Sequence, residues 1–145
     1  KLLQEHGIKM DISLPLPFVF VVGRSDGTIN FVGTLIYPQY IYDALLKNKN
    51  LVKTATNKFK LIAKTDKKNN PLVELHIQLR KGCSPSKKLS NEYLATLTKY
   101  FTELNNDFAQ DFYFIKEKTK KNPFVMCLYQ YEKYPFAKGI KVHYV

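Results

Sequence analysis

The sequence predicts an α+β domain in which helices pack on one face of a small antiparallel sheet, in the order αββαβ, after a short β-hairpin. Three observations lead to this prediction. From Leu72 to Arg80 apolar and polar residues alternate, which is the period of a half-buried strand. Tyr93, Leu97 and Phe101 recur at helical spacing. The chain has 145 residues, a length that suits one hydrophobic core.

The first elements are a connector and a hairpin. Residues 1–17 are expected to be a connector, with a short helical stretch over 2–6 and an extended segment at 14–17, where Pro15 and Pro17 exclude a helix. The chain opens on Lys1, so we expect an excised part of a longer protein, with residues 18–145 as one domain. Residues 18–22 and 29–32 are β-branched and aromatic runs around the turn residues 23–27, which predicts a hairpin.

The middle of the chain predicts a helix followed by two strands. Pro38 suits a first helical turn, and Ile41 and Leu45 repeat at helical spacing, so we expect a helix over 38–48. Strands are expected over 51–64 and 72–80, joined by a turn at 65–71.

The last third predicts a helix and two further strands. Ser90 is the expected N-cap of a second helix that ends at Asn105. Residues 112–115 and 124–129 are apolar enough for strands, and the lysine-rich residues 116–121 between them are expected to form a solvated loop.

The net positive charge of the chain favours only diffuse, non-specific attraction to polyanions. The chain has 23 Lys and Arg against 12 Asp and Glu, a net charge of +11, but only Arg24 and Arg80 are arginines. Lysine gives solubility and diffuse attraction rather than the bidentate contacts of specific recognition.

Cys83 and Cys127 form no metal-ligand cluster with the histidines, so we expect free thiols and a cytoplasmic protein. Prolines interrupt the longest apolar stretch, so no transmembrane segment is expected.

The densest motif lies between residues 23 and 38. Gly23, Arg24 and Asp26 come first; Gly33 follows seven residues after the aspartate, and Ile36 three residues later. This spacing resembles the motif that opens the small C-terminal domain of adenylate-forming enzymes. Pro38 resembles the phenylacetate-CoA ligase and capsule-protein-like branch. In this family the helix isoleucine is followed by an acidic residue, where this chain has Tyr42.

The end of the chain resembles the terminal lysine motif of the same family. We align Lys141 with the adenylation lysine, and Lys138 is the competing candidate. A lysine ammonium near the α-phosphate of ATP would stabilise the charge that develops when a carboxylate attacks it.

The resemblance implies the lid domain of a carboxylate-CoA ligase, which is inactive alone. It implies that Asp26 is the hinge, that Arg24 reaches the nucleotide ribose, and that Gly33 lets the pantetheine arm pass. The implied substrates are ATP, a carboxylic acid, and CoA or a carrier-protein thiol, with Mg²⁺ held by a missing N-terminal domain. We expect no membrane partner.

Two other classes of function remain open. A basic αββαβ module could bind RNA or single-stranded DNA, but a recognition sheet of that kind needs a basic-Gly-aromatic string that this chain lacks. A small-molecule regulatory domain of similar topology is the other alternative. His76, between Glu74 and Gln78, is expected to be a sheet-face histidine.

Overall fold

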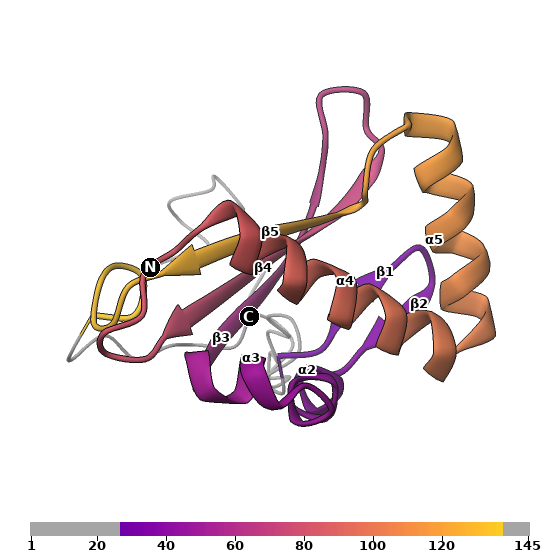
Figure 1. The fold of residues 1–145 in the computed structure, drawn as a ribbon. Helices are drawn as coiled ribbons and strands as arrows, with labels where there is room; N and C mark the ends of the chain where they lie inside the picture. Colours follow the sequence, from indigo (N-terminus) through magenta and orange to yellow (C-terminus); the bar gives the residue numbers. More distant parts are fainter. Residues whose placement is uncertain (1–26, 138–145) are drawn as a thin grey trace, which may run out of the picture.

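A computed structural model describes residues 27–137 (Figure 1). In chain order the elements are β1 (Ile29–Phe31), β2 (Thr34–Ile36), α2 (Pro38–Leu46), α3 (Lys49–Thr54), β3 (Ala55–Thr65), β4 (Pro71–Leu79), α4 (Lys87–Leu104), α5 (Asn106–Thr119) and β5 (Phe124–Tyr129). The predicted α+β class is confirmed. None of the helices in the described part of the chain is long and apolar enough to cross a membrane.

The strands form a two-stranded hairpin, β1–β2, and a three-stranded sheet in the order β3-β4-β5. β3 and β4 are antiparallel, as expected, with Leu61 opposite Leu75. β5 runs parallel to β4, with Met126 opposite Leu75. The sheet is therefore mixed. The two helices between β4 and β5 carry the chain back to the end of the sheet at which β4 begins, so β5 runs in the same direction as β4.

One face of the sheet supports the main core. Val73, Leu75 and Ile77 of β4 are fully buried and share a core with the stripe of α4 that the sequence predicts. In Figure 1, α4 crosses this face of the sheet. The predicted amphipathic stripe therefore serves the purpose that its spacing indicates, which is burial against strands.

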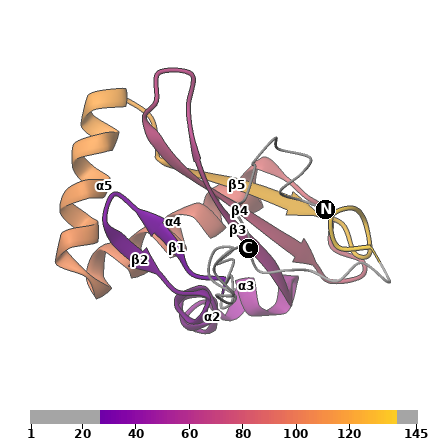
Figure 2. The same ribbon diagram turned by 180° about the vertical axis from the view of Figure 1, so that it is seen from behind.

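An aromatic cluster joins the hairpin to the rest of the domain. Phe124 of β5 lies within 5.7 to 6.1 Å, centroid to centroid, of the rings of Phe31, Phe101, Phe108 and Phe112. These rings come from β1, α4 and α5. Seen from behind in Figure 2, the hairpin lies beside α5. Its position is thus fixed by buried ring contacts rather than by strand pairing with the larger sheet.

Residues 51–54 are helical, and the predicted strand there is wrong. The side chain of Asn48 accepts hydrogen bonds from the backbone N–H groups of Asn50 and Leu51, at 3.1 and 3.4 Å, and so begins α3. The strand β3 starts only at Ala55. The helix α2 also ends at Leu46, slightly before the predicted end at residue 48.

Residues 112–115 are also helical, within α5, so the predicted strand is wrong here too. Asn105 accepts a hydrogen bond from the Phe108 N–H at 3.1 Å and caps α5. Phe108, Phe112 and Ile115 are buried on one face at helical spacing. Much of the predicted lysine-rich loop therefore belongs to this helix, which ends at Thr119.

Two further boundaries differ from the predictions. α4 begins at Lys87 with Ser86 as its N-cap, one turn before the predicted cap Ser90. β1 pairs with β2 across the turn Val32–Gly33, and β2 was not predicted. The first predicted hairpin strand, residues 18–22, lies outside the described residues, as do most of its turn and the connector.

Candidate functional site

The turn between β1 and β2 has the tightest geometry in the motif region. Phe31 is paired with Thr34, so only Val32 and Gly33 connect the strands. Both have positive φ, at +53° and +96° respectively. A two-residue hairpin turn with positive φ at both positions matches the twist of the flanking strands. Gly33 meets this requirement without strain, since it has no Cβ.

Val32 meets the same requirement at a cost. A β-branched residue in the left-handed region is strained by about 1–3 kcal/mol. Val32 is 48% exposed, so full burial in the core does not explain the choice of valine. Backbone strain of this kind gathers at functional sites, which makes the tip a candidate contact surface.

The base of the hairpin is held firmly while its tip is open. Ile29, Phe31 and Ile36 are buried in the core. A Cβ built on Gly33 would meet no atom within 4 Å among the described residues. As far as residues 27–137 are concerned, the backbone at Gly33 therefore has open space beside it, from which another molecule could approach it closely.

The motif continues from the hairpin into α2. Pro38 occupies the first helical position and Ile41 is fully buried, as the sequence predicts. Tyr42, the next residue, joins α2 to β3. Its hydroxyl donates to the Asn57 carbonyl at 2.9 Å, and its ring packs edge-on against Phe59.

Most of the predicted site residues lie outside the described part of the chain. Arg24, Asp26, Lys138 and Lys141 are among residues 1–26 and 138–145, so their positions and roles stay predictions. Gly33 is described, at the hairpin tip. Gly27, next to Asp26, has φ of +71°, a conformation that suits glycine.

A second polar cluster, which the sequence did not predict, lies on the other face of the sheet. Glu74 Oε2 contacts Lys64 Nζ at 2.8 Å and His76 Nε2 at 3.1 Å. His76 Nδ1 lies 2.8 Å from the Tyr129 hydroxyl, and the two rings stack with centroids 5.5 Å apart. The parallel register of β5 brings Tyr129 to this position.

The electrostatics of this cluster favour a fixed ion pair. The bond from Lys64 is the main cause that lowers the pKa of Glu74, with partial burial opposing it. Burial raises the pKa of Cys127, so its thiol stays protonated and is a poor nucleophile. No group of His, Cys, Asp and Glu within residues 27–137 could hold a metal ion. We therefore infer that this cluster helps to hold the strands β3, β4 and β5 together.

Solved structures with a weak likeness to this chain include two enzymes or enzyme domains. No protein-family model and no curated protein matches the sequence. A domain of phenylacetate-coenzyme A ligase from Bacteroides vulgatus is 15% identical, with a TM-score of 0.46, over 80% of this chain and 90% of that one. A Brucella canis acyl-CoA synthetase is 18% identical, with a TM-score of 0.44, over 84% of this chain but only 18% of that one. Values this low assign neither a family nor a function to this chain.

Proposed function

We propose that the chain is the C-terminal lid domain of an ATP-dependent carboxylate-CoA ligase. The observation that carries the proposal is the hairpin tip. The second glycine of the motif, Gly33, lies at a turn that requires positive φ, and Ile36 and Pro38 follow as a buried strand end and a helix start. The motif spacing thus coincides with a well-formed local structure whose tip is open.

The proposed reaction has two steps. In the first, a carboxylate oxygen attacks the α-phosphorus of ATP, an acyl-adenylate forms, and pyrophosphate leaves. In the second, a thiol sulfur attacks the acyl carbon, a thioester forms, and AMP leaves with the bonding electrons while the thiol proton is released. The carboxylic acid pocket and the Mg²⁺ site would belong to a larger N-terminal domain.

The residues of this chain would act at different steps. Lys141, or Lys138 in the alternative alignment, would stabilise charge on the α-phosphate during the first step. Arg24 would contact the nucleotide ribose. Asp26 would be the hinge about which the lid rotates between steps, and Gly27 beside it would tolerate the backbone change.

Gly33 would act in the second step. Since no atom of the described part of the chain lies within 4 Å of a Cβ position there, its backbone would leave room for the extended arm of a thiol substrate. An alanine there would place a methyl group in this space and would also strain a residue with φ of +96°. A functional test must therefore distinguish a blocked path for the thiol arm from a distorted hairpin.

The test measures the two half-reactions separately in the full-length protein. Gly33→Ala is expected to slow thioester formation while ATP–pyrophosphate exchange is retained. Val32→Ala is the matched control, since it changes the same turn without adding a group at position 33. Equal loss of both half-reactions in Gly33→Ala, with an unchanged melting temperature, would contradict the proposed role. An upstream reading frame without a Ser/Thr/Gly-rich phosphate loop would contradict the enzyme class.

A further inference from the structure

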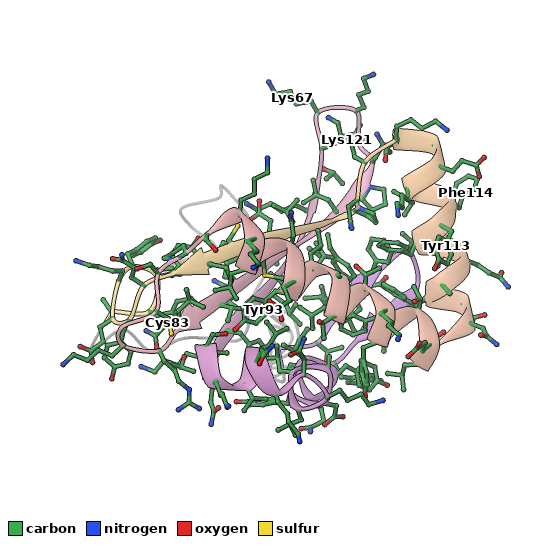
Figure 3. The ribbon with its side chains drawn as sticks, in the orientation of Figure 1. Lys67, Cys83, Tyr93, Tyr113, Phe114 and Lys121 are labelled. Carbon is green, nitrogen blue, oxygen red and sulfur yellow. The ribbon has the colours of Figure 1, made fainter. Side chains whose placement is uncertain are left out.

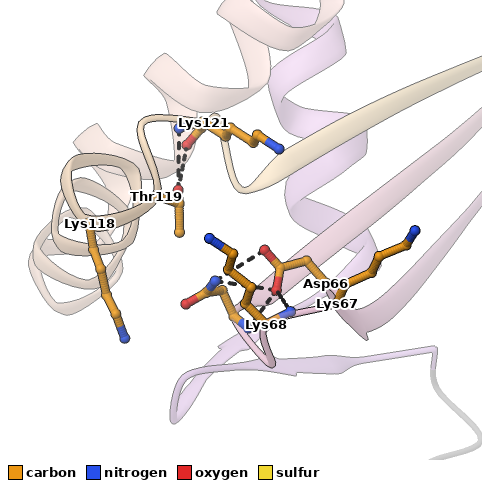
Figure 4. Close-up of a pocket in the computed structure, with 7 residues that line it drawn as sticks. Asp66, Lys67, Lys68, Lys118, Thr119 and Lys121 are labelled. Atoms are coloured by element: carbon orange, nitrogen blue, oxygen red, sulfur yellow. Dashed lines mark hydrogen bonds between the residues drawn. The ribbon is translucent and has the colours of Figure 1, made fainter.

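A lysine-rich pocket lies at the end of the domain where the β3–β4 turn meets the end of α5 (Figure 4). Its volume is about 560 Å³. Its lining includes Lys67 and Lys68 from the turn, and Lys118 and Lys121 from the α5 end. The two sides of the pocket are about fifty residues apart in sequence, and the fold brings them together.

The end of α5, with Lys118, Thr119 and Lys121, forms one wall of this pocket. Lys120 adopts a left-handed conformation, with φ of +55°, and ends the helix. The Thr119 hydroxyl donates to the Ile115 carbonyl at 2.8 Å and lies 3.3 Å from the Lys121 N–H, which can donate to it. The wall that carries Lys121 is therefore held by hydrogen bonds within the helix end.

The one carboxylate in the pocket is already used by the turn. Asp66 Oδ1 accepts hydrogen bonds from the backbone N–H groups of Lys68 and Asn70, at 2.7 and 2.9 Å. The Asn70 side-chain amide also donates to it. These bonds lower the pKa of Asp66, so it stays ionised at neutral pH. Its role is to close the β3–β4 turn.

Among the described residues, the pocket places Asp66 beside the four lysines, and the charge of Lys121 helps to lower the pKa of Asp66. None of them forms an ion pair with a carboxylate among residues 27–137. The pocket lining contains four lysines against one carboxylate, a net charge of +3. Like charges gathered in this way repel one another, and a multivalent anion would relieve that repulsion.

We propose that this pocket binds the phosphate groups of a small multivalent phosphate compound, such as a diphosphate or triphosphate. Each lysine can donate up to three charge-assisted hydrogen bonds to phosphate oxygens. A concave pocket with several cations suits a compact polyanion. This site is separate from the hairpin tip and does not depend on the proposed ligase function.

The observations favour a small anion over a nucleic acid strand. Single-stranded nucleic acid requires aromatic side chains on which bases stack, and none lines this pocket. The exposed aromatic residues Tyr113 and Phe114 come earlier in α5, away from the β3–β4 turn that carries Lys67 (Figure 3). Tyr113 lines a neighbouring pocket, which Lys121 also borders.

The test is calorimetric titration of the full chain with inorganic tripolyphosphate at physiological salt. The double variant Lys68→Gln/Lys121→Gln removes one charge from each wall and is expected to weaken binding about tenfold or more. The control is Lys58→Gln/Lys81→Gln. It removes two charges from another pocket, which Arg80 and Tyr131 also line. Control binding is expected to stay within about twofold of the wild type.

Two results would overturn the proposal. Equal weakening in both double variants would mean that tripolyphosphate follows overall charge rather than this pocket. Tighter binding of an oligothymidylate than of tripolyphosphate, lost in Lys68→Gln/Lys121→Gln, would make the surface a nucleic acid site instead. Melting curves of each variant establish that it is folded. Neither result bears on acyl transfer, so the proposed ligase function is tested independently.

Discussion

The Asn30 side chain accepts a hydrogen bond from the Gly33 backbone N–H at 2.7 Å. This bond spans the two-residue turn at the tip of the β1–β2 hairpin, on the exposed side of strand β1. Since Ile29 and Phe31 on either side of Asn30 are buried, the hairpin is held by the core below and by this bond above. The tip is thereby preorganised around Gly33.

Loss of this bond should destabilise the hairpin measurably. Asn30→Ala removes the acceptor for the Gly33 N–H and is expected to lower the free energy of unfolding by about 1 kcal/mol. Urea denaturation followed by circular dichroism measures the change. Asn30→Asp keeps an acceptor at the same position and serves as the control. If the two variants lose equal stability, the Asn30–Gly33 bond does not stabilise the turn.

The strain at Val32 predicts a change of the opposite sign. Val32→Asn places a residue that tolerates the left-handed region at φ of +53°. Since Val32 is 48% exposed, only part of its packing can be lost, and stability should rise by about 0.5–1 kcal/mol. The melting temperature reports this directly. A lower melting temperature for Val32→Asn would show that the valine contributes contacts that outweigh its strain.

The ion pair on the open sheet face predicts a dependence on acid. The pKa of Glu74 is lowered in the folded protein, so its contribution to stability is present above the ordinary value of 4.5 and is lost as the pH falls through the folded value. Glu74→Gln should therefore flatten the curve of unfolding free energy against pH below 4.5. Lys64 is half exposed, so the effect should shrink at high salt.

The control for this prediction is Lys99→Gln, which removes the exposed pair with Glu103 on α4. An exposed helical pair of this kind contributes little to stability. Its acid dependence should match that of the wild type. If Glu74→Gln keeps the full wild-type slope below pH 4.5, the pairing of Glu74 with Lys64 does not govern acid stability.

The sequence predicted the elements whose periodicity is unambiguous. Alternation identified β4, and the long apolar stripe identified α4. The strand predicted at 112–115 is wrong because four apolar residues suit a short strand as well as one buried turn of a helix. That error also affected the sheet, since a strand at 112–115 hides the helical crossover that makes β5 parallel to β4.

The residues of the candidate site also differ in whether the sequence alone could predict them. Gly33 could be singled out because it belongs to a local motif that resembles the one in adenylate-forming enzymes, and its role stays a prediction. The contact between His76 and Tyr129 could not, because it depends on the register of two strands that are far apart in the chain. The lysine pocket likewise forms only when the β3–β4 turn meets the end of α5, which no local pattern indicates.

The central claim, that the chain supplies the lysine of an adenylation reaction, is tested most directly at Lys141. ATP–pyrophosphate exchange in the full-length protein should fall by roughly 10²–10³ in Lys141→Ala, the range expected when one preorganised electrostatic contact is removed. Thioester formation from supplied acyl-adenylate should change little. Lys138→Ala, the matched control, should exchange at nearly the wild-type rate. Loss in Lys138→Ala alone would move the lysine to the alternative alignment, and wild-type exchange in both variants would contradict the account.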